Sequence, residues 1–276
     1  MIDKKKFYIN GEWVDPINKQ SLDVIDPSTE KSCATISLGG KEDINKAVNA
    51  AKKAYETWGF SSKEERIKLL ENLYVLYKKR WADIANAITM EMGAPKDFST
   101  KLQTGTGASH IKSFIRYLKE FKFEKPLGEH APDQRIIYEP KGVCALITPW
   151  NWPMNQVCLK VIPALSAGCT MVLKPSELAP LSSMILAEII HEAKFPSGVF
   201  NLVNGDGATT GDALTSHPEI NMISFTGSTR AGVLISQNAA KDFKRVSLEL
   251  GGKGANIIFK DADPEAIERG ALRCFR

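Results

Sequence analysis

The spacing of apolar residues changes along the chain, and each change predicts a different kind of structure. Residues 7–14 form two short apolar runs divided by Asn10-Gly11, which is typical of a β-hairpin with a two-residue turn. A further strand is expected at 22–25. From residue 41 onward, apolar residues recur every three or four positions, which predicts amphipathic helices. Helices are expected from residue 41, from the capping pattern at 61–64, at 81–92 and at 98–119.

After residue 120 the pattern changes again. Residues 121–139 are polar and rich in turn residues, with a strand expected at 135–139. Beyond Pro140, apolar runs alternate with helical periods, and the unbroken run at 143–147 is typical of a strand covered on both faces. Strands are expected at 143–147, 170–173, 199–203, 222–225, 246–250 and 255–259, and helices at 155–167, 181–193, 208–216, 229–240 and from 264. This alternation predicts a doubly wound α/β fold with a mostly parallel sheet and right-handed crossovers.

Composition indicates a soluble globular protein of one large or two ordinary domains. Of the 276 residues, 43% are hydrophobic and 25% are charged, and the formal net charge is +4. Basic residues are interspersed with acids, so we expect no nucleic-acid partner. No apolar run is long enough to span a bilayer, and the N-terminus lacks the apolar core of a signal peptide. We therefore expect no membrane association.

The cysteines indicate a reducing compartment. There are five of them, an odd number without close pairing, and three lie among Val, Leu and Ala. We interpret them as reduced, mostly buried thiols of a cytoplasmic protein. No CxxC pair or histidine cluster predicts a metal site.

One carboxylate stands inside an apolar run. Glu249 lies between Leu248 and Leu250 and is followed by Gly251-Gly252. It is either a surface residue on an alternating strand or an acid in a dry pocket, where its pKa would rise and it could serve as a general base. Taken alone, the pattern favours the surface position.

Unusual loops follow two of the expected strands, at the end of the sheet where ligands of α/β proteins bind. After the first comes Thr148-Pro149-Trp150-Asn151-Trp152-Pro153, in which the Asn151 amide could donate to a developing oxyanion. A loop simply packed by two tryptophans is an equal alternative. After the second comes Lys174-Pro175-Ser176-Glu177, which could hold ribose hydroxyls or could be a solvated turn before a helix.

Two glycine loops also join strands to helices. Asn204 to Gly211 has GxGxxxG spacing, and Phe225-Thr226-Gly227-Ser228 leads into the next helix. Helix N-termini present free N–H groups that bind phosphates, although glycine loops often serve only as turns. Two such loops at strand ends are better evidence than one.

Together these stretches resemble the aldehyde dehydrogenase superfamily over essentially the whole chain. The motifs are Ile-Thr-Pro-Trp-Asn-Trp-Pro at 147–153, Leu-Lys-Pro-Ser-Glu at 173–177, Gly-Val-Phe-Asn-Leu-Val at 198–203, Ser-Phe-Thr-Gly-Ser at 224–228 and Leu-Glu-Leu-Gly-Gly-Lys at 248–253. The resemblance implies a Rossmann-like NAD-binding domain at 1–120 and 140–260. It also implies a protruding oligomerisation hairpin at 121–139 and the start of a catalytic domain at 261–276.

The resemblance also implies roles for individual residues. Asn151 would be the oxyanion-hole amide, and Glu249 the general base that activates the hydrolytic water. Lys174 and Glu177 would hold the adenine ribose, and a glutamate there favours NAD, with NADP possible. The remaining cofactor-binding residues would be Ile147, Thr148, Pro149, Trp150, Ser176, Gly207, Gly211, Phe225, Thr226, Gly227, Ser228, Leu250 and Gly251.

The sequence departs from the family pattern at the nucleophile. Relatives attack the aldehyde with a cysteine in a Gly-Gln-x-Cys motif, and no such motif is present here. Cys274 lies on an expected helix beside Leu272 and Phe275, so we interpret it as a packing residue. We expect an NAD-dependent aldehyde oxidation to a carboxylic acid in a full-length homo-oligomer, a dimer or tetramer. We expect no turnover from the 276 residues alone, since they would be a truncated form, and a non-enzymatic dinucleotide-binding or subunit-association fragment is the alternative.

Overall fold

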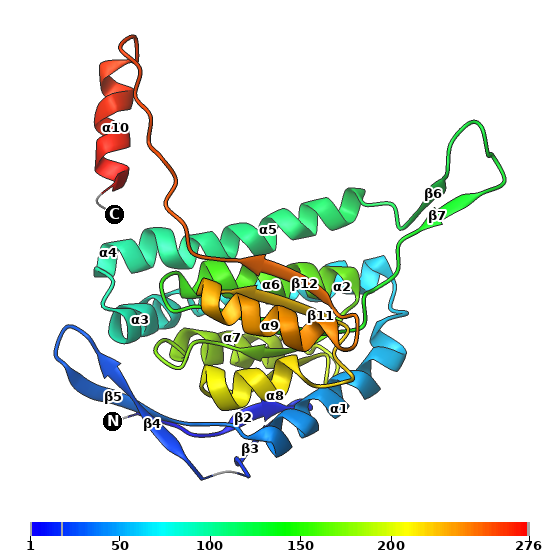
Figure 1. Ribbon diagram of the computed structural model, residues 1–276, viewed down its shortest axis with the longest axis horizontal. Helices are drawn as coiled ribbons and strands as arrows, with labels where there is room; N and C mark the ends of the chain where they lie inside the picture. The colour runs from blue at the N-terminus through cyan, green and yellow to red at the C-terminus, as the bar shows by residue number, and fades with distance from the viewer. Residues whose placement is uncertain (1, 18, 275–276) are drawn as a thin grey trace.

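A seven-stranded sheet forms the centre of the molecule (Figure 1). The computed structural model describes residues 2–17 and 19–274, and for residues 273 and 274 it describes the backbone alone. The strand order is β12-β11-β8-β9-β10-β2-β3, in which the first five strands are parallel and the last two antiparallel. The strands are β2 (Phe7–Ile9), β3 (Glu12–Val14), β8 (Val143–Ile147), β9 (Thr170–Lys174), β10 (Phe200–Leu202), β11 (Met222–Thr226) and β12 (Arg245–Glu249). The expected doubly wound, Rossmann-like α/β fold is confirmed.

Helices cover both faces of this sheet. Residues of β8 alternate between two buried clusters, with Cys144 and Leu146 in one and Val143, Ala145 and Ile147 in the other. The first cluster includes α2 (Lys63–Lys79), α3 (Trp81–Met92), α5 (Thr104–Glu120), α6 (Pro153–Ala167) and α7 (Leu181–Glu192). The second includes α1 (Lys41–Trp58), α8 (Asp212–Thr215) and α9 (Thr229–Ala240). Burial on both faces is why β8 reads as an unbroken apolar run.

Local signals predicted the hairpin and the helix starts well. Asn10 and Gly11 have φ of 55° and 82°, the left-handed values that a tight hairpin turn needs. Helix α2 begins after Ser62, whose hydroxyl accepts the Glu65 N–H at 3.1 Å. Helix α3 ends at Gly93, which has φ of 74°.

The helix expected at 98–119 is interrupted. It is built from α4 (Lys96–Phe98), a π-helical turn η1 (Ser99–Gln103) and α5. Gly107 packs so closely on Tyr77 that a Cβ would lie 2.3 Å from the tyrosine hydroxyl. The helix expected at 208–216 is likewise a π-helical turn η2 (Gly207–Gly211) followed by α8.

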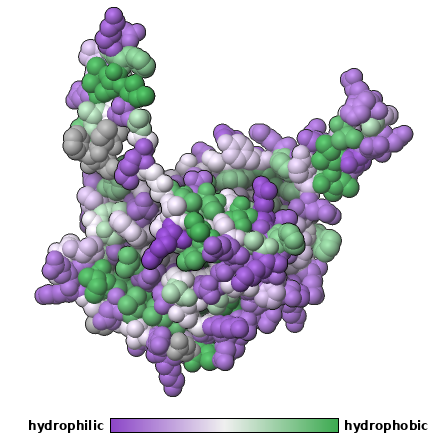
Figure 2. Space-filling view, in the orientation of Figure 1, coloured by the Kyte–Doolittle hydropathy of each residue, from purple (hydrophilic) through white to green (hydrophobic). Residues whose placement is uncertain are grey.

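The strand expected at 255–259 is wrong. The chain there forms no strand, and Ile257 and Phe259 are 71% and 72% exposed. A strand needs a partner for its backbone hydrogen bonds, and among the described residues β12 pairs only with β11. The segment instead leaves the sheet and leads to α10 (Pro264–Cys274), with apolar side chains exposed along this projection (Figure 2). The side chain of Cys274 lies outside the described residues.

A small sheet near the N-terminus was missed. It has the order β1-β5-β4, formed by β1 (Ile2–Lys4), β5 (Lys31–Ser37) and β4 (Ser21–Asp26). Only β4 overlaps a predicted strand. The exposed β1 shows no apolar alternation, so only its pairing with β5 makes it a strand.

The polar segment at 121–139 forms a hairpin that projects from the body (Figure 1). Within the described ranges, its strands β6 (Glu124–Pro126) and β7 (Arg135–Ile137) pair only with each other. Cys144, Cys158 and Cys169 are buried free thiols, as expected for three of the cysteines, and Cys33 is a half-buried free thiol. In the part of the chain that the structure describes, no helix is long and apolar enough to cross a membrane, and no cluster of metal-ligating side chains occurs.

Candidate cofactor and active site

The strand order reverses between β8 and β11. From β8 the chain proceeds outward through β9 and β10, then returns to β11 on the other side of β8. Neighbouring loops therefore leave in opposite directions at this point, which opens a crevice at the carboxyl ends of the strands. The candidate residues at 147–151 and 225–228 include the last residues of β8 and β11 and the loops after them, and so lie at this edge.

Strand register brings three predicted residues into one row. Ile147 pairs with Lys174 on one side and with Phe225 on the other. Thr226, one residue further, pairs with Glu249. The Thr226 hydroxyl is buried and has no hydrogen-bond partner among the described residues. A buried hydroxyl without a partner is unusual and marks a place where a ligand atom could bind.

A cavity of about 280 Å³ opens beside this row. It lies between the glycine loop of η2 and helices α8 and α9, and its lining is mostly apolar. Five of the lining residues were predicted from the sequence, and the others were not. The lining residues are Ile147, Lys174, Gly207, Ala208, Gly211, Asp212, Thr215, Phe225, Ala231, Leu234, Ile235 and Asn238.

Glycine keeps this cavity open. A Cβ at Gly207 would meet no atom within 4 Å, and one at Gly211 would make only ordinary contacts, the nearest at 3.5 Å. Packing therefore does not require glycine at either position, whereas a Cβ at Gly205 would lie 1.8 Å from Thr210 Oγ1. Gly207 and Gly211 leave room for a ligand, while Gly205 serves the fold.

Lys174 is a buried cation with every proton engaged. The residue is 3% exposed, and its Nζ donates to Pro175 O at 3.1 Å, to Glu177 Oε2 at 3.3 Å and to Gly205 O. Burial lowers the pKa of Lys174, and the nearby Glu177 carboxylate opposes that shift. The ammonium thus joins the end of β9 to the η2 loop and orients Glu177, whose side chain is 31% exposed beside it.

The two helix N-termini differ in what they offer an anion. At η2, Asp206 occupies the N-terminus itself, since its carboxylate accepts the Thr209 N–H at 2.6 Å. At α9, the Ser228 hydroxyl accepts only the Ala231 N–H at 3.2 Å. The N–H groups of Thr229 and Arg230 have no intrahelical acceptor and are available to a phosphate.

The loop after β8 presents Asn151 to solvent. Trp152 packs edge-on against Phe98 with ring centroids 5.3 Å apart, whereas Trp150 is 51% exposed. The Asn151 backbone carbonyl accepts from Gln103 Nε2 at 3.4 Å. Its side-chain amide has no hydrogen-bond partner among the described residues, so it is free to act as a donor.

Glu249 is exposed at the end of β12. No dry pocket surrounds it among the described residues. Lys160, a residue that sequence reasoning missed, lies on α6 and is 8% exposed, and its Nζ donates to Ser224 Oγ at 3.0 Å. Burial lowers the pKa of Lys160 to about 8, against the attraction of the Glu249 charge. The lysine and the glutamate therefore interact electrostatically at this end of the site.

Apart from Ala208, which lies within the glycine loop at 204–211, the missed lining residues carry no motif of their own. Leu234 is 57% exposed although it lies on an amphipathic helix, and only the fold brings α9 opposite α8. An exposed leucine in the middle of a helix is a weak signal, because single exposed apolar residues are common. The remaining predicted residues, Thr148, Pro149, Ser176, Leu250 and Gly251, lie on the loops that border this edge of the sheet.

The fold and site define a doubly wound α/β protein with a cavity of about 280 Å³ at its switch point. A model of the Aldehyde dehydrogenase family matches residues 13–275. The chain belongs to the aldehyde dehydrogenase family.

Several relatives are similar over nearly the whole chain. A 3-succinoylsemialdehyde-pyridine dehydrogenase from a Pseudomonas species is 50% identical over 99% of this chain and 57% of its own length. A crystal structure of an aldehyde dehydrogenase from Bartonella henselae superposes with a TM-score of 0.98 at 60% identity, covering 100% of this chain and 58% of its own. A mutant aldehyde dehydrogenase C from Pseudomonas syringae, in complex with NAD+ and octanal, has a TM-score of 0.95 at 44% identity, over 99% of this chain and 56% of its own. The chain thus spans little more than half the length of these relatives.

Proposed function

We propose that this chain forms the NAD-binding part of an enzyme that oxidises an aldehyde to a carboxylic acid through a thioester. In this proposal residues 1–120 and 140–260 make the cofactor domain and residues 261–276 begin the catalytic domain. The similarity to an aldehyde dehydrogenase solved with NAD+ and octanal supports the choice of cofactor and substrate class. The observation that carries the proposal is the cavity at the switch point, which Gly207 and Gly211 keep open.

The described residues fit the adenosine half of NAD. The apolar walls from α8 and α9 suit an adenine ring, and the Glu177 carboxylate can accept from ribose hydroxyls. The free N–H groups at the start of α9 suit the pyrophosphate, next to Gly227 and Ser228. A glutamate rather than a basic residue at 177 favours NAD, because a 2′-phosphate would be repelled.

The other half of the site supplies the chemistry. NAD, when bound, accepts the hydride. The Asn151 amide would donate to the oxygen of the substrate as negative charge develops on it. Glu249 would take a proton from the water that hydrolyses the thioester, and the positive charge of Lys160 would help to orient its carboxylate.

A polypeptide of these 276 residues should bind NAD without steady turnover. None of its five cysteines stands in a Gly-Gln-x-Cys motif. A binding or subunit-association role is therefore the second candidate, and it is favoured by the exposed hairpin, where Ile137 is 65% exposed and Tyr138 42%. The same exposed strand supports the proposal that the hairpin joins subunits of a homo-oligomer.

Tryptophan fluorescence tests the binding step. Trp150 and Trp152 lie on the loop after β8, so NAD binding at the switch point should change their emission. Saturable quenching by NAD, with no NADH formed from added aldehyde, is the expected result. A chain that does not respond to millimolar NAD would overturn the cofactor assignment, and steady NADH formation would overturn the expected inactivity.

A further inference from the structure

Glu91 is a buried carboxylate that the proposed reaction does not use. It lies one residue before the end of α3 and is 4% exposed. Its Oε1 accepts the Ser182 N–H at 3.1 Å and the Ser182 hydroxyl at 2.6 Å, and its Oε2 accepts the Leu181 N–H. In the described part of the chain, no salt bridge includes Glu91. The carboxylate is therefore satisfied entirely by the first turn of α7.

The position of Glu91 in its own helix is unfavourable. A negative charge near the C-terminus of α3 opposes the dipole of that helix, whereas the same charge at the N-terminus of α7 is stabilising. The N-cap of α7 is Pro180, which has no N–H, and two of the three N–H groups that α7 leaves without intrahelical acceptors bind Glu91. Desolvation raises the pKa of Glu91 to about 7 despite these bonds. The Glu91 carboxylate therefore stabilises the N-terminus of α7 and not its own helix α3.

The first turn of α7 continues the loop that carries Glu177. Residues 175–180, which we call the ribose loop, connect β9 to α7. Lys174 holds the start of the loop through its bonds to Pro175 O and Glu177, and Glu91 holds its end at Leu181. Between these anchors the loop makes short-range bonds of its own, from Leu178 N–H to Ser176 Oγ at 3.3 Å and from Ala179 N–H to Ser176 O at 3.2 Å. The ribose loop, which carries Glu177, is therefore anchored at both of its ends.

We propose that Glu91 is a positioning residue for the cofactor. By fixing the first turn of α7, it sets where the ribose loop presents the Glu177 carboxylate to the adenine ribose. The inference rests on the proposed function, since it requires that Glu177 bind this ribose. Without Glu91 the α7 N-terminus is left with two unsatisfied buried N–H groups, and the loop can move away from the β9 edge.

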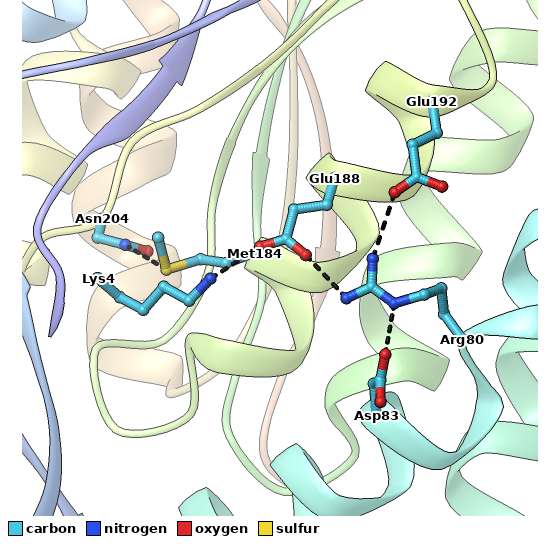
Figure 3. Close-up of polar contacts among 7 residues, drawn as sticks. All are labelled: Lys4, Arg80, Asp83, Met184, Glu188, Glu192 and Asn204. Carbon is cyan, nitrogen blue, oxygen red and sulfur yellow. Dashed lines mark hydrogen bonds and ion pairs between the residues drawn. The ribbon is translucent and has the colours of Figure 1, made fainter. Parts of the chain in front are cut away.

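Glu188 provides a matched control. It lies on the same helix, and its two carboxylate oxygens accept from Lys4 Nζ and Arg80 Nη2, each at 2.8 Å (Figure 3). Arg80 immediately precedes α3, so Glu188 also joins α7 to the α3 region. It does so near the other end of α7, away from the ribose loop. Glu188→Gln therefore disturbs the same packing without touching the loop.

The test is calorimetric titration of the 276-residue chain with NAD. We expect Glu91→Ala to weaken NAD binding about tenfold, since it displaces one hydrogen bond between a charged carboxylate and the ribose. Glu188→Gln should bind NAD as the unmodified chain does. AMP and its 2′,3′-dideoxy analogue give a second readout. The Glu91→Ala loss should appear with AMP and vanish with the dideoxy analogue, which has no hydroxyl for Glu177 to hold.

The outcomes separate the two proposals. A chain that binds no NAD before any substitution overturns the proposed function, and with it this inference. If the unmodified chain binds NAD and Glu91→Ala binds it equally well, or loses affinity for both AMP analogues alike, Glu91 is structural only. Should Glu91→Ala fail to fold, Ser182→Ala removes one of the three bonds to the carboxylate, and Glu91→Gln keeps the shape. Both should weaken AMP binding by a smaller factor, and unchanged affinity in both would overturn the inference.

Discussion

The two halves of the candidate site differ in how far the described residues enclose them. At the adenosine half, Lys174 is buried with all its protons bonded, and a cavity of about 280 Å³ is formed by β9, η2 and α9. At the chemical half, Asn151 and Glu249 are exposed, and in the described part of the chain neither side chain has a hydrogen-bond partner that would orient it. Binding geometry is therefore built into these residues, whereas an oxyanion donor and a base work well only where water is excluded. The adenosine half should be sensitive to substitution, and the chemical half should tolerate it in the isolated chain.

Filling the cavity gives the largest expected effect. Gly207→Leu should weaken NAD binding at least about 100-fold, because the new side chain enters the space proposed for adenine. The melting temperature should hardly change, since a Cβ at Gly207 meets no atom within 4 Å. Gly254→Leu, also open to space but outside the cavity, is the control and should bind NAD normally. Unchanged NAD affinity in Gly207→Leu would remove the cavity from the site.

Removing the buried ammonium should affect both stability and binding. Lys174→Met leaves the carbonyls of Pro175 and Gly205 and the Glu177 carboxylate without their donor. We expect a loss of about 3 kcal/mol in the free energy of unfolding by urea titration. Lys101→Met breaks only an exposed ion pair with Asp97 and should cost less than about 0.5 kcal/mol. Similar losses in the two variants would contradict the contrast between the enclosed and exposed halves.

Glu91 should make stability depend on pH. Its pKa is raised in the folded state to about 7 from 4.5, so its contribution is full below pH 4.5 and is lost as the pH rises through 7. Between pH 5 and pH 7 we expect about 2 kcal/mol of this contribution to disappear. The measurement is the difference in unfolding free energy between the unmodified chain and Glu91→Gln. That difference cancels other titrations, including Lys160, whose lowered pKa of about 8 acts above this range. A flat difference would show that Glu91 stays ionised throughout.

The smallest effect is expected at the chemical half. Asn151→Ala and Glu249→Gln should each change the unfolding free energy by less than about 0.5 kcal/mol, because exposed side chains without partners contribute little to stability. NAD affinity should also remain within about twofold. A large loss of stability in either variant, seen in thermal melts, would mean that this half is held by contacts in the chain after all.

Much of the fold could be predicted because its signals are local. The turn at Asn10-Gly11, the cap at Ser62 and the stop at Gly93 each depend on the conformation or hydrogen bonds of a few adjacent residues. Strands β8 and β9, which are buried throughout, were found because burial on both faces requires unbroken apolar runs. The strand expected at 255–259 failed for the opposite reason, since apolar content cannot show whether a partner strand is present. For the same reason β1 was not predicted, because only its pairing with β5 makes it a strand.

The candidate site divides in the same way. The sequence by itself determined which loops carry glycine, lysine and glutamate, and their order along the chain, because these residue types have distinct backbone freedom and charge. Only the tertiary structure decided that Ile147, Lys174 and Phe225 lie in one row, that α9 walls the cavity, and that Glu91 reaches Leu181 from 90 residues away. Strand register and helix packing join residues that are distant in sequence, and no local pattern records which distant groups will meet.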